Sequence, residues 1–277
     1  MSGWLQAVLL GIVQGLTEFL PVSSSGHLVL AQLWLGEQFL FVKEAVAFDL
    51  VLHVGTLLPV LYFYRRDLAQ ILAALVRDVP LSRPGSWRQW LSSDEHRWLA
   101  MLVVVGTIPT AVMGVLLKDT FESLFHDPTP VCIALIFTGF LLMSTRYLER
   151  PNGLKRLSLI MALIIGIAQG FAITPGISRS GTTIAVALLL GVDRDHAARF
   201  SFLLSIPAIM GAVVLVAKDG VTLPADGWAA LGMGFLSAMI VGYFALWMLV
   251  ALVRKGGLYR FAYYLWPVAI AGLFYLT

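Results

Sequence analysis

Five ionisable side chains lie inside otherwise apolar stretches of this 277-residue sequence, and they mark where its chemistry could take place. An ionisable group at membrane depth costs about 2.5 to 3.5 kcal/mol on insertion scales, so each one needs a partner or a function. Carboxylates and imidazoles transfer protons, whereas a guanidinium binds anions. Together such groups could act on an anionic substrate. The five residues are Glu18, His27, Asp49, His53 and Arg179.

The stretch ProGlyIleSerArgSerGlyThrThr at 175–183 has the composition of a phosphate-binding site. Arg179 can grip phosphate oxygens with two N–H groups at once, and the helix predicted at 181–191 directs its N-terminal N–H groups toward an anion. Alternatively, the hydroxyl groups only cap this helix while Arg179 extends to the membrane surface. We favour the phosphate cradle, because capping leaves further hydroxyls beside Arg179 unexplained. These hydroxyls belong to Ser178, Ser180, Thr182 and Thr183.

The stretch ProValSerSerSerGlyHis at 21–27 follows a predicted helix that carries Gln14 and Glu18 on one face. A carboxylate, hydroxyls and an imidazole this close together are the ingredients of proton transfer and of nucleophilic or metal-assisted displacement. Taken alone, Glu18 and His27 could equally form a buried structural hydrogen bond. Opposite an Arg179 cradle, the catalytic interpretation is favoured. The hydroxyls belong to Ser23, Ser24 and Ser25.

Asp49 and His53 are separated by one helical turn in the next apolar run. They could support the site by orienting its residues, form a proton path, or only satisfy each other within the membrane. We favour the supporting role.

The elements that must position these residues are membrane helices. The composition is 59% hydrophobic and 13% charged, which is roughly half the charge of an average soluble domain. Lys and Arg are scattered through short loops, so the sequence indicates no nucleic-acid partner. The single Cys132 cannot form an intrachain disulfide. Apolar runs able to cross a hydrocarbon core of about 30 Å are predicted at 46–64, 99–117, 128–145, 200–217, 228–253 and 261–277.

Two further apolar segments, 4–35 and 157–192, are interrupted in the middle by Pro, Gly and hydroxyl residues. The backbone at each break must be buried in protein or line a wet cavity, because lipid cannot hydrogen-bond to it. We predict an all-α polytopic membrane protein with six transmembrane helices plus two re-entrant helical hairpins arranged as an inverted repeat. The repeats are 1–150 and 151–277, in one integral membrane domain.

The two interrupted segments resemble each other in sequence. Residues 11–27 and 166–182 align without gaps and match at seven of seventeen positions. A shared Gly-x-x-Gln-Gly followed by Ser-x-Ser-Gly argues against chance similarity. Inverted repeats place such hairpin tips together near the bilayer midplane, so one chamber would hold all five ionisable residues. The identical pairs are Gly11/Gly166, Ile12/Ile167, Gln14/Gln169, Gly15/Gly170, Ser23/Ser178, Ser25/Ser180 and Gly26/Gly181.

The distribution of basic residues predicts the orientation in the membrane. Placing the loop 65–98 in the cytoplasm assigns fifteen of the 19 Lys and Arg residues to the inside. Only Lys43, Lys118 and Lys218 fall outside, and Arg179 lies within a hairpin. Both termini are then predicted to be extracytoplasmic.

GlnGlyLeuThrGluPheLeuProValSerSerSerGlyHis at 14–27 and the motif at 175–183 resemble the two signatures of the bacterial undecaprenyl-diphosphate phosphatases, the bacitracin-resistance family. The resemblance covers the whole chain in length, hairpin placement and span number. It implies a multi-pass hydrolase of the bacterial cytoplasmic (inner) membrane, with its active site facing the extracytoplasmic side. Such an enzyme converts undecaprenyl diphosphate to undecaprenyl phosphate and inorganic phosphate, which recycles the lipid carrier of cell-wall synthesis.

The resemblance also implies residue roles. Gln14 departs from the family pattern, because many members have Glu there. If this position helps to bind a divalent cation, Mg²⁺ or Ca²⁺, then Glu18 is left as the main carboxylate ligand, with Gln14 as a second. The matching functional positions are Glu18, Ser24 and His27 in the first motif and Ser178, Arg179 and Thr183 in the second.

The predicted mechanism assigns catalysis to Glu18, Ser24, His27 and Arg179. Arg179 neutralises charge as the phosphorus is attacked, and Glu18 binds the cation or acts as a base. His27 transfers protons, whereas Ser24 is a nucleophile or a phosphate ligand. Water and His27 itself are the other possible nucleophiles. The residues predicted to bind the substrate phosphates are Ser25, Ser178, Ser180 and Thr183.

Two other functions use the same features. Inverted repeats with broken helices are also the architecture of secondary transporters, so a transporter or lipid flippase is the leading alternative. A non-catalytic membrane scaffold would not need five ionisable groups at depth. The predicted partners are undecaprenyl diphosphate and membrane lipid, and a bundle of this size is compatible with a homodimer.

Overall fold

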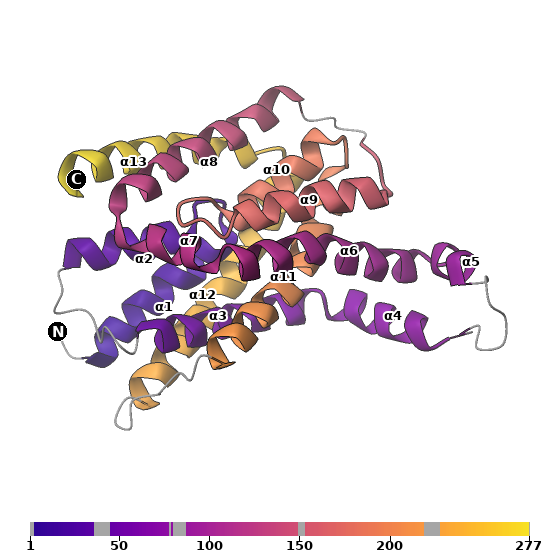
Figure 1. Cartoon of the computed structure of the whole chain (residues 1–277), viewed down its shortest axis with the longest axis horizontal. Helices are drawn as coiled ribbons and strands as arrows, with labels where there is room; N and C mark the ends of the chain where they lie inside the picture. Colours follow the sequence, from indigo (N-terminus) through magenta and orange to yellow (C-terminus); the bar gives the residue numbers. More distant parts are fainter. Residues whose placement is uncertain are drawn as a thin grey trace.

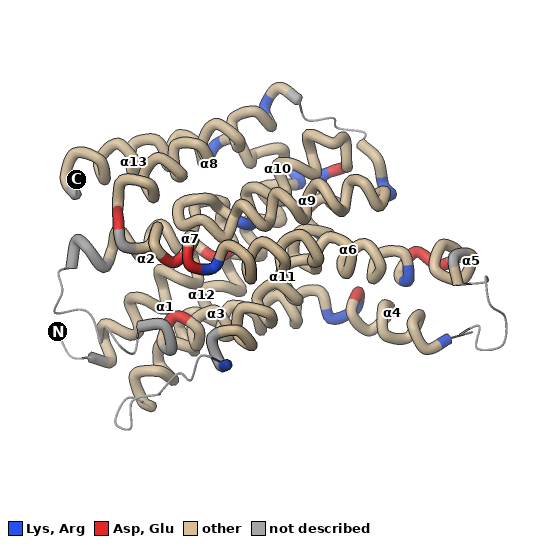
Figure 2. Tube along the Cα trace, viewed as in Figure 1, with Lys and Arg blue, Asp and Glu red and all other residues tan. Residues whose placement is uncertain are grey.

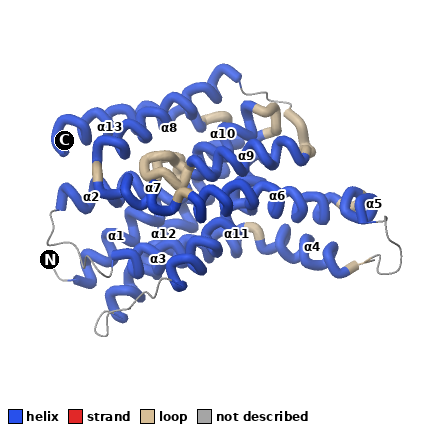
Figure 3. Tube along the Cα trace, in the orientation of Figure 1, coloured by secondary structure: helices blue, strands red, loops and turns tan. Residues whose placement is uncertain are grey.

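Helices make up nearly all of the structure. The computed structural model describes residues 3–35, 45–77, 79, 87–148, 153–218 and 228–276, and within these ranges it contains no β-sheet (Figures 1 and 3). In chain order the helices are α1 (Gly3–Phe19), α2 (Ser24–Leu35), α3 (Ala45–Phe63), α4 (Arg65–Val76), α5 (Trp87–Ser92), α6 (Glu95–Leu116), α7 (Lys118–Ser123), η2 (Leu124–His126), α8 (Pro128–Leu148), α9 (Leu159–Phe171), α10 (Arg179–Leu189), α11 (Arg194–Lys218), α12 (Trp228–Arg254), η3 (Leu258–Phe261) and α13 (Ala262–Leu276).

Four of these helices, α6, α8, α11 and α12, are long and apolar enough to cross a membrane. Each of the six predicted spans coincides with a helix, and the other two are α3 and α13. Large apolar side chains on the outer faces are more than half exposed, which suits contact with lipid rather than water. Examples are Val104, Ile133, Phe140, Phe244 and Trp247.

The two interrupted segments form helix pairs, as predicted. In the first pair, α1 ends at Phe19 and α2 begins at Ser24, with Ser23 at the connection in the left-handed region, at φ 69°. In the second pair, α9 and α10 are joined by residues 172–178, where Gly176 has φ 94°. The second helix of this pair begins two residues earlier than predicted, because Oγ of Ser178 accepts a hydrogen bond from the Gly181 N–H and caps the helix at this point.

The two helix pairs pack in corresponding ways. Helix α1 packs along α12, and α9 packs along α6. Both approaches are so close that a methyl group at Gly11 would collide with the main chain of Gly234, and one at Gly166 with that of Gly106. Gly11 and Gly166 are also identical partners in the internal alignment. Each of these two glycines therefore allows the first helix of its pair to approach a long helix closely.

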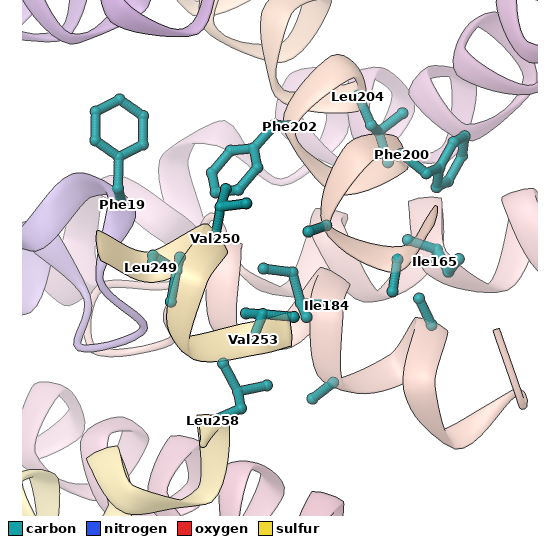
Figure 4. Packing of buried hydrophobic residues seen from close by; sticks show 14 of the residues in the cluster. Phe19, Ile165, Ile184, Phe200, Phe202, Leu204, Leu249, Val250, Val253 and Leu258 are labelled. Carbon is teal, nitrogen blue, oxygen red and sulfur yellow. The ribbon is translucent and has the colours of Figure 1, made fainter. Parts of the chain in front are cut away.

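The buried core is built largely from α9, α10, α11 and α12 and extends to residues of α1, α3, α6, α8 and α13; Figure 4 shows part of it. Phe200 and Leu204 on α11 are almost completely buried, as is Ile184 on α10. Helix α10 packs against α8, α9 and α11, and these contacts fix its position. The residues labelled in Figure 4 are Phe19, Ile165, Ile184, Phe200, Phe202, Leu204, Leu249, Val250, Val253 and Leu258.

Charged residues gather toward the end of the molecule that carries α4 and α5 (Figure 2). There, Arg199 on α11 pairs with Asp67 at 2.6 Å and with Glu95 at 3.1 Å, which ties α11 to α4 and α6. Asp94 caps α6, and hydrogen bonds from the backbone N–H groups of Arg97 and His96 hold the pKa of its carboxyl below the usual value. These polar contacts fix one end of the bundle outside the apolar spans.

Candidate active site

The two interrupted segments meet at their breaks. Oγ of Ser23 accepts a hydrogen bond from the backbone N–H of Gly176 at 3.1 Å. The contact is close on both sides, since a methyl group at Gly26 would lie 3.1 Å from the Cα atom of Gly176. Thr138 on α8 donates to the Gly176 carbonyl at 3.0 Å and accepts from the Ser178 N–H at 3.3 Å. The tip predicted at 21–27 therefore lies against the tip predicted at 175–183.

Glu18 is the centre of the polar cluster formed there, and its side chain is only 3% exposed. Its Oε2 atom accepts hydrogen bonds from Ser24 Oγ at 2.7 Å and from Gln14 Nε2 at 3.0 Å. Its Oε1 atom pairs with Nη2 of Arg179, and His53 Nε2 lies 3.6 Å from Oε2. Four helices, α1, α2, α3 and α10, thus direct side chains at one buried carboxylate.

The Arg179 side chain is 23% exposed, so the cluster is open on the guanidinium side. Glu18 engages Nη2, whereas a guanidinium carries five N–H donors. N–H groups of Arg179 therefore remain for an anion. The alternative in which Arg179 extends to the membrane surface is wrong, because its guanidinium pairs with Glu18 inside the protein.

The hydroxyl groups around Arg179 have mixed roles. Ser178 Oγ caps α10 and lies 3.3 Å from Ser180 Oγ, so the capping interpretation is correct for Ser178. Thr183 donates to the Arg179 carbonyl at 2.9 Å, within the helix. The buried Thr182 Oγ1 has no hydrogen-bond partner within the described ranges. Ser180, with its oxygen 3.5 Å from the Leu20 carbonyl, touches the first tip.

His27 lies beside the Glu18 cluster rather than in it. Its Nδ1 atom is 2.8 Å from the Ser23 carbonyl, and its Nε2 atom is 2.8 Å from the hydroxyl of Tyr264 on α13. Ser25 is on the same turn, with its hydroxyl 3.3 Å from Ser23 Oγ. The first tip therefore has two polar sides, one facing Glu18 and the other facing α13.

His53 approaches Glu18, but it does so without using the Asp49 side chain. The Nδ1 atom of His53 lies 2.7 Å from the main-chain oxygen of Asp49, a contact that any residue at position 49 could supply. The supporting role of His53 thus has a geometric basis in its approach to Glu18. The supporting role of the Asp49 carboxylate stays a prediction.

Comparison with known proteins defines the family. The family model described as bacitracin resistance protein BacA matches residues 7–271. The chain belongs to the BacA family. The curated undecaprenyl-diphosphatase of Halothermothrix orenii is 44% identical over 97% of this chain and 98% of its own. The undecaprenyl-diphosphatase of Methanobrevibacter smithii is 43% identical over 96% of this chain and 95% of its own. That of Desulfosudis oleivorans is 46% identical over 94% of this chain and 94% of its own.

In this BacA-family chain, Tyr264 contacts His27 of the first tip, and no sequence motif marks it. It lies in an apolar span rich in aromatic residues and directly follows another tyrosine, Tyr263. To choose Tyr264 over Tyr263 from the sequence, one would need to predict which face of this span contacts the first tip. Ser23 was noted only as one hydroxyl of the first tip, whereas the structure makes it the joint between the two tips.

Proposed function

We propose that the chain is an undecaprenyl-diphosphatase, which hydrolyses undecaprenyl diphosphate to undecaprenyl phosphate and inorganic phosphate and so recycles the cell-wall lipid carrier. The observation that carries this proposal is the contact of Glu18 with both Ser24 and Arg179 where the two tips meet. A hydroxyl beside a carboxylate, next to a guanidinium, is an arrangement suited to phosphoryl transfer. The near full-length similarity to relatives of that name supports the same activity.

The geometry favours Ser24 as the nucleophile. Glu18 Oε2, at 2.7 Å from Ser24 Oγ, is within reach to take the hydroxyl proton. Oγ would then attack the terminal phosphorus, and the P–O bond to undecaprenyl phosphate would break. Arg179 neutralises the charge on the transferred group, and water afterwards releases inorganic phosphate from Ser24. His27 would take the proton of this water at Nε2, exchanging its contact with the Tyr264 hydroxyl.

A divalent cation fits the residues only together with the substrate. Gln14 is fully buried, and its Oε1 atom has no hydrogen-bond partner in the part of the chain that the structure describes. This amide oxygen and the Glu18 carboxylate are the hard donors that Mg²⁺ or Ca²⁺ prefers. Within the described ranges no three His, Cys, Asp or Glu side chains could hold a metal together, so oxygens of the substrate and of water would complete the set. The cation would neutralise charge on the diphosphate.

We propose the six-span inverted repeat for the arrangement in the membrane. The equivalent packing of α1 on α12 and of α9 on α6 supports it. The first residues of α1 and the last of α13 lie at one end of the molecule, and α4 and α5 lie at the other (Figure 1). This agrees with extracytoplasmic termini and a cytoplasmic 65–98 segment in an inner membrane, with the site open to the outside. Of the basic residues counted, Lys43, Arg83 and Arg150 lie outside the described residues.

The orientation predicts a labelling pattern. In a Cys132→Ser background, Glu122→Cys on α7 should react with a membrane-impermeant thiol reagent added to intact cells, because this exposed position is placed outside. Gln89→Cys on α5 is also exposed but should react only after the cells are opened. The opposite labelling pattern would refute the orientation.

The activity itself is tested by phosphate release. The purified chain should liberate inorganic phosphate from undecaprenyl diphosphate in detergent, and EDTA should abolish the release if the cation completes the site. Transport or flipping of the lipid without phosphate release would favour the transporter alternative instead. Ser24→Ala should lower the rate at least about 100-fold, because it removes the proposed nucleophile.

A further inference from the structure

We propose that Tyr264 is a positioning residue for His27, an inference that rests on the proposed phosphatase function. Its hydroxyl lies 2.8 Å from Nε2 of His27, although the two residues are 237 positions apart in the sequence. The two rings are also nearly parallel, with an interplanar angle of 9° and centroids 5.6 Å apart. A hydrogen bond and a ring contact therefore fix the imidazole from the α13 side.

The two partners of His27 also define its tautomer. The Ser23 carbonyl can only accept a hydrogen bond, so Nδ1, at 2.8 Å from it, must carry a proton. In the neutral ring Nε2 then holds the lone pair, and the Tyr264 hydroxyl donates to it. Without this donor, the Nε2 side of the imidazole would lose its polar partner and the ring angle would be less restricted, whereas the Ser23 carbonyl would still hold the proton on Nδ1.

This contact connects α13 to the two tips. Tyr264 holds His27, His27 donates to the Ser23 carbonyl, and Ser23 Oγ accepts from the Gly176 N–H of the second tip. The imidazole is thereby held in register with the start of α10, which carries Arg179. Because a misplacement of about 1 Å can cost on the order of 100-fold in rate, this alignment matters for proton transfer during phosphate release.

The neighbouring tyrosine shows that the contact is specific to one position. Tyr263 has 55% of its surface exposed, and its hydroxyl accepts a hydrogen bond from Arg146 at 3.4 Å. Tyr264 is similarly exposed, at 46%, yet its hydroxyl bonds to His27. Two adjacent tyrosines on α13 thus provide a test residue and a matched control.

The test compares Tyr264→Phe with Tyr263→Phe in the purified full-length enzyme. Tyr264→Phe keeps the ring but removes the donor, so kcat for phosphate release should fall roughly 10- to 100-fold with little change in KM. Nitrogen NMR of labelled histidine, with the His27 signals assigned through His27→Asn, should show a proton on Nδ1 in both enzymes, because the Ser23 carbonyl is kept, and an Nε2 signal that shifts in Tyr264→Phe, because its hydrogen bond is lost. Tyr263→Phe should change neither measurement.

Both changes are required, so a change in only one of them, or in neither, would overturn the role of Tyr264. Equal thermal unfolding temperatures of the two variants would exclude a folding defect as the cause. The NMR measurement needs no turnover, so it separates this proposal from the proposed function. A parent enzyme that releases no phosphate, although its Nε2 signal differs from that of Tyr264→Phe, would refute the phosphatase activity, and with it the catalytic relevance of the contact.

Discussion

Arg179→Lys is expected to lower the rate of phosphate release about 30- to 1,000-fold, although the positive charge is kept. Glu18 already engages Nη2 of Arg179, so the diphosphate must use the remaining N–H groups of the planar guanidinium. An ammonium group paired with Glu18 cannot present the same two-point contact to a phosphate. The lost transition-state contact corresponds to about 2 to 4 kcal/mol.

The matched control is Arg146→Lys, the same substitution at an exposed position on α8. Initial rates of phosphate release at saturating lipid should be near normal for Arg146→Lys and strongly reduced for Arg179→Lys. Near-normal turnover in a folded Arg179→Lys variant would mean that the guanidinium supplies only a long-range charge.

The helices that form the site could be predicted because particular residue types mark where the two apolar segments are interrupted. Pro21 and Gly176 interrupt apolar runs that would otherwise continue as helices, and lipid cannot satisfy the backbone there. The internal alignment then placed the two tips together, and the structure confirms that they touch through Ser23 and Gly176. Motif chemistry and membrane physics together were sufficient for this part of the site.

The direct pairing of Arg179 with Glu18 was not predicted. The two residues were assigned to the phosphate and to the cation or base, but a buried charge without its ligand requires a partner within the protein. Each residue satisfies this need for the other. Diphosphate binding must therefore share or displace this ion pair, which no residue pattern reveals without coordinates.

The contact between α13 and His27 could not be predicted from the sequence either. Whether Tyr263 or Tyr264 faces His27 depends on the rotation of α13 about its axis, and packing against α8 sets that rotation. A span that is apolar on all sides carries no periodic signal that predicts it. The same reason explains why Asp49 appeared equivalent to His53, although only His53 approaches Glu18.

Glu18→Gln is expected to be nearly inactive at any cation concentration, with a loss of at least about 100-fold. The amide keeps the shape of the carboxylate, but it cannot accept the proton of Ser24, which lies 2.7 Å away. It also leaves the guanidinium of Arg179 without its counter-charge. Phosphate release measured across a range of Mg²⁺ or Ca²⁺ concentrations, after removal of bound cation with EDTA, tests this result.

Gln14→Glu exchanges the same two side-chain types in the opposite direction, and it should retain activity with a lower cation concentration for half-maximal rate. Gln14 Nε2 now donates to Glu18 Oε2 at 3.0 Å, in a position that is fully buried. A second carboxylate there would repel the first one unless a cation lies between them. The added charge should therefore tighten binding of the cation.

The second half of the chain offers a matched control for this effect. Gln169 is the repeat equivalent of Gln14 and is also buried, but it donates to Thr110 at 3.1 Å, and the position corresponding to Glu18 is Ile173. Gln169→Glu adds a carboxylate at a position whose partner one turn away is Ile173 instead of a carboxylate, so it should lower the unfolding temperature and leave the cation requirement unchanged.

Gln14→Glu and Gln169→Glu add the same charge, but of these two positions only Gln14 contacts Glu18. Comparing the two variants therefore distinguishes an effect of the added charge from an effect of its position. If Glu18→Gln kept substantial activity, or Gln14→Glu showed an unchanged cation requirement, the α1 face would not be a cation site. In the second case Glu18 would act through its hydrogen bond to Ser24 and its ion pair with Arg179 alone, and in the first case Glu18 would also not be the base. Displacement would depend on Ser24, His27 and the Arg179 cradle, and removal of cations by EDTA should leave the rate unaffected.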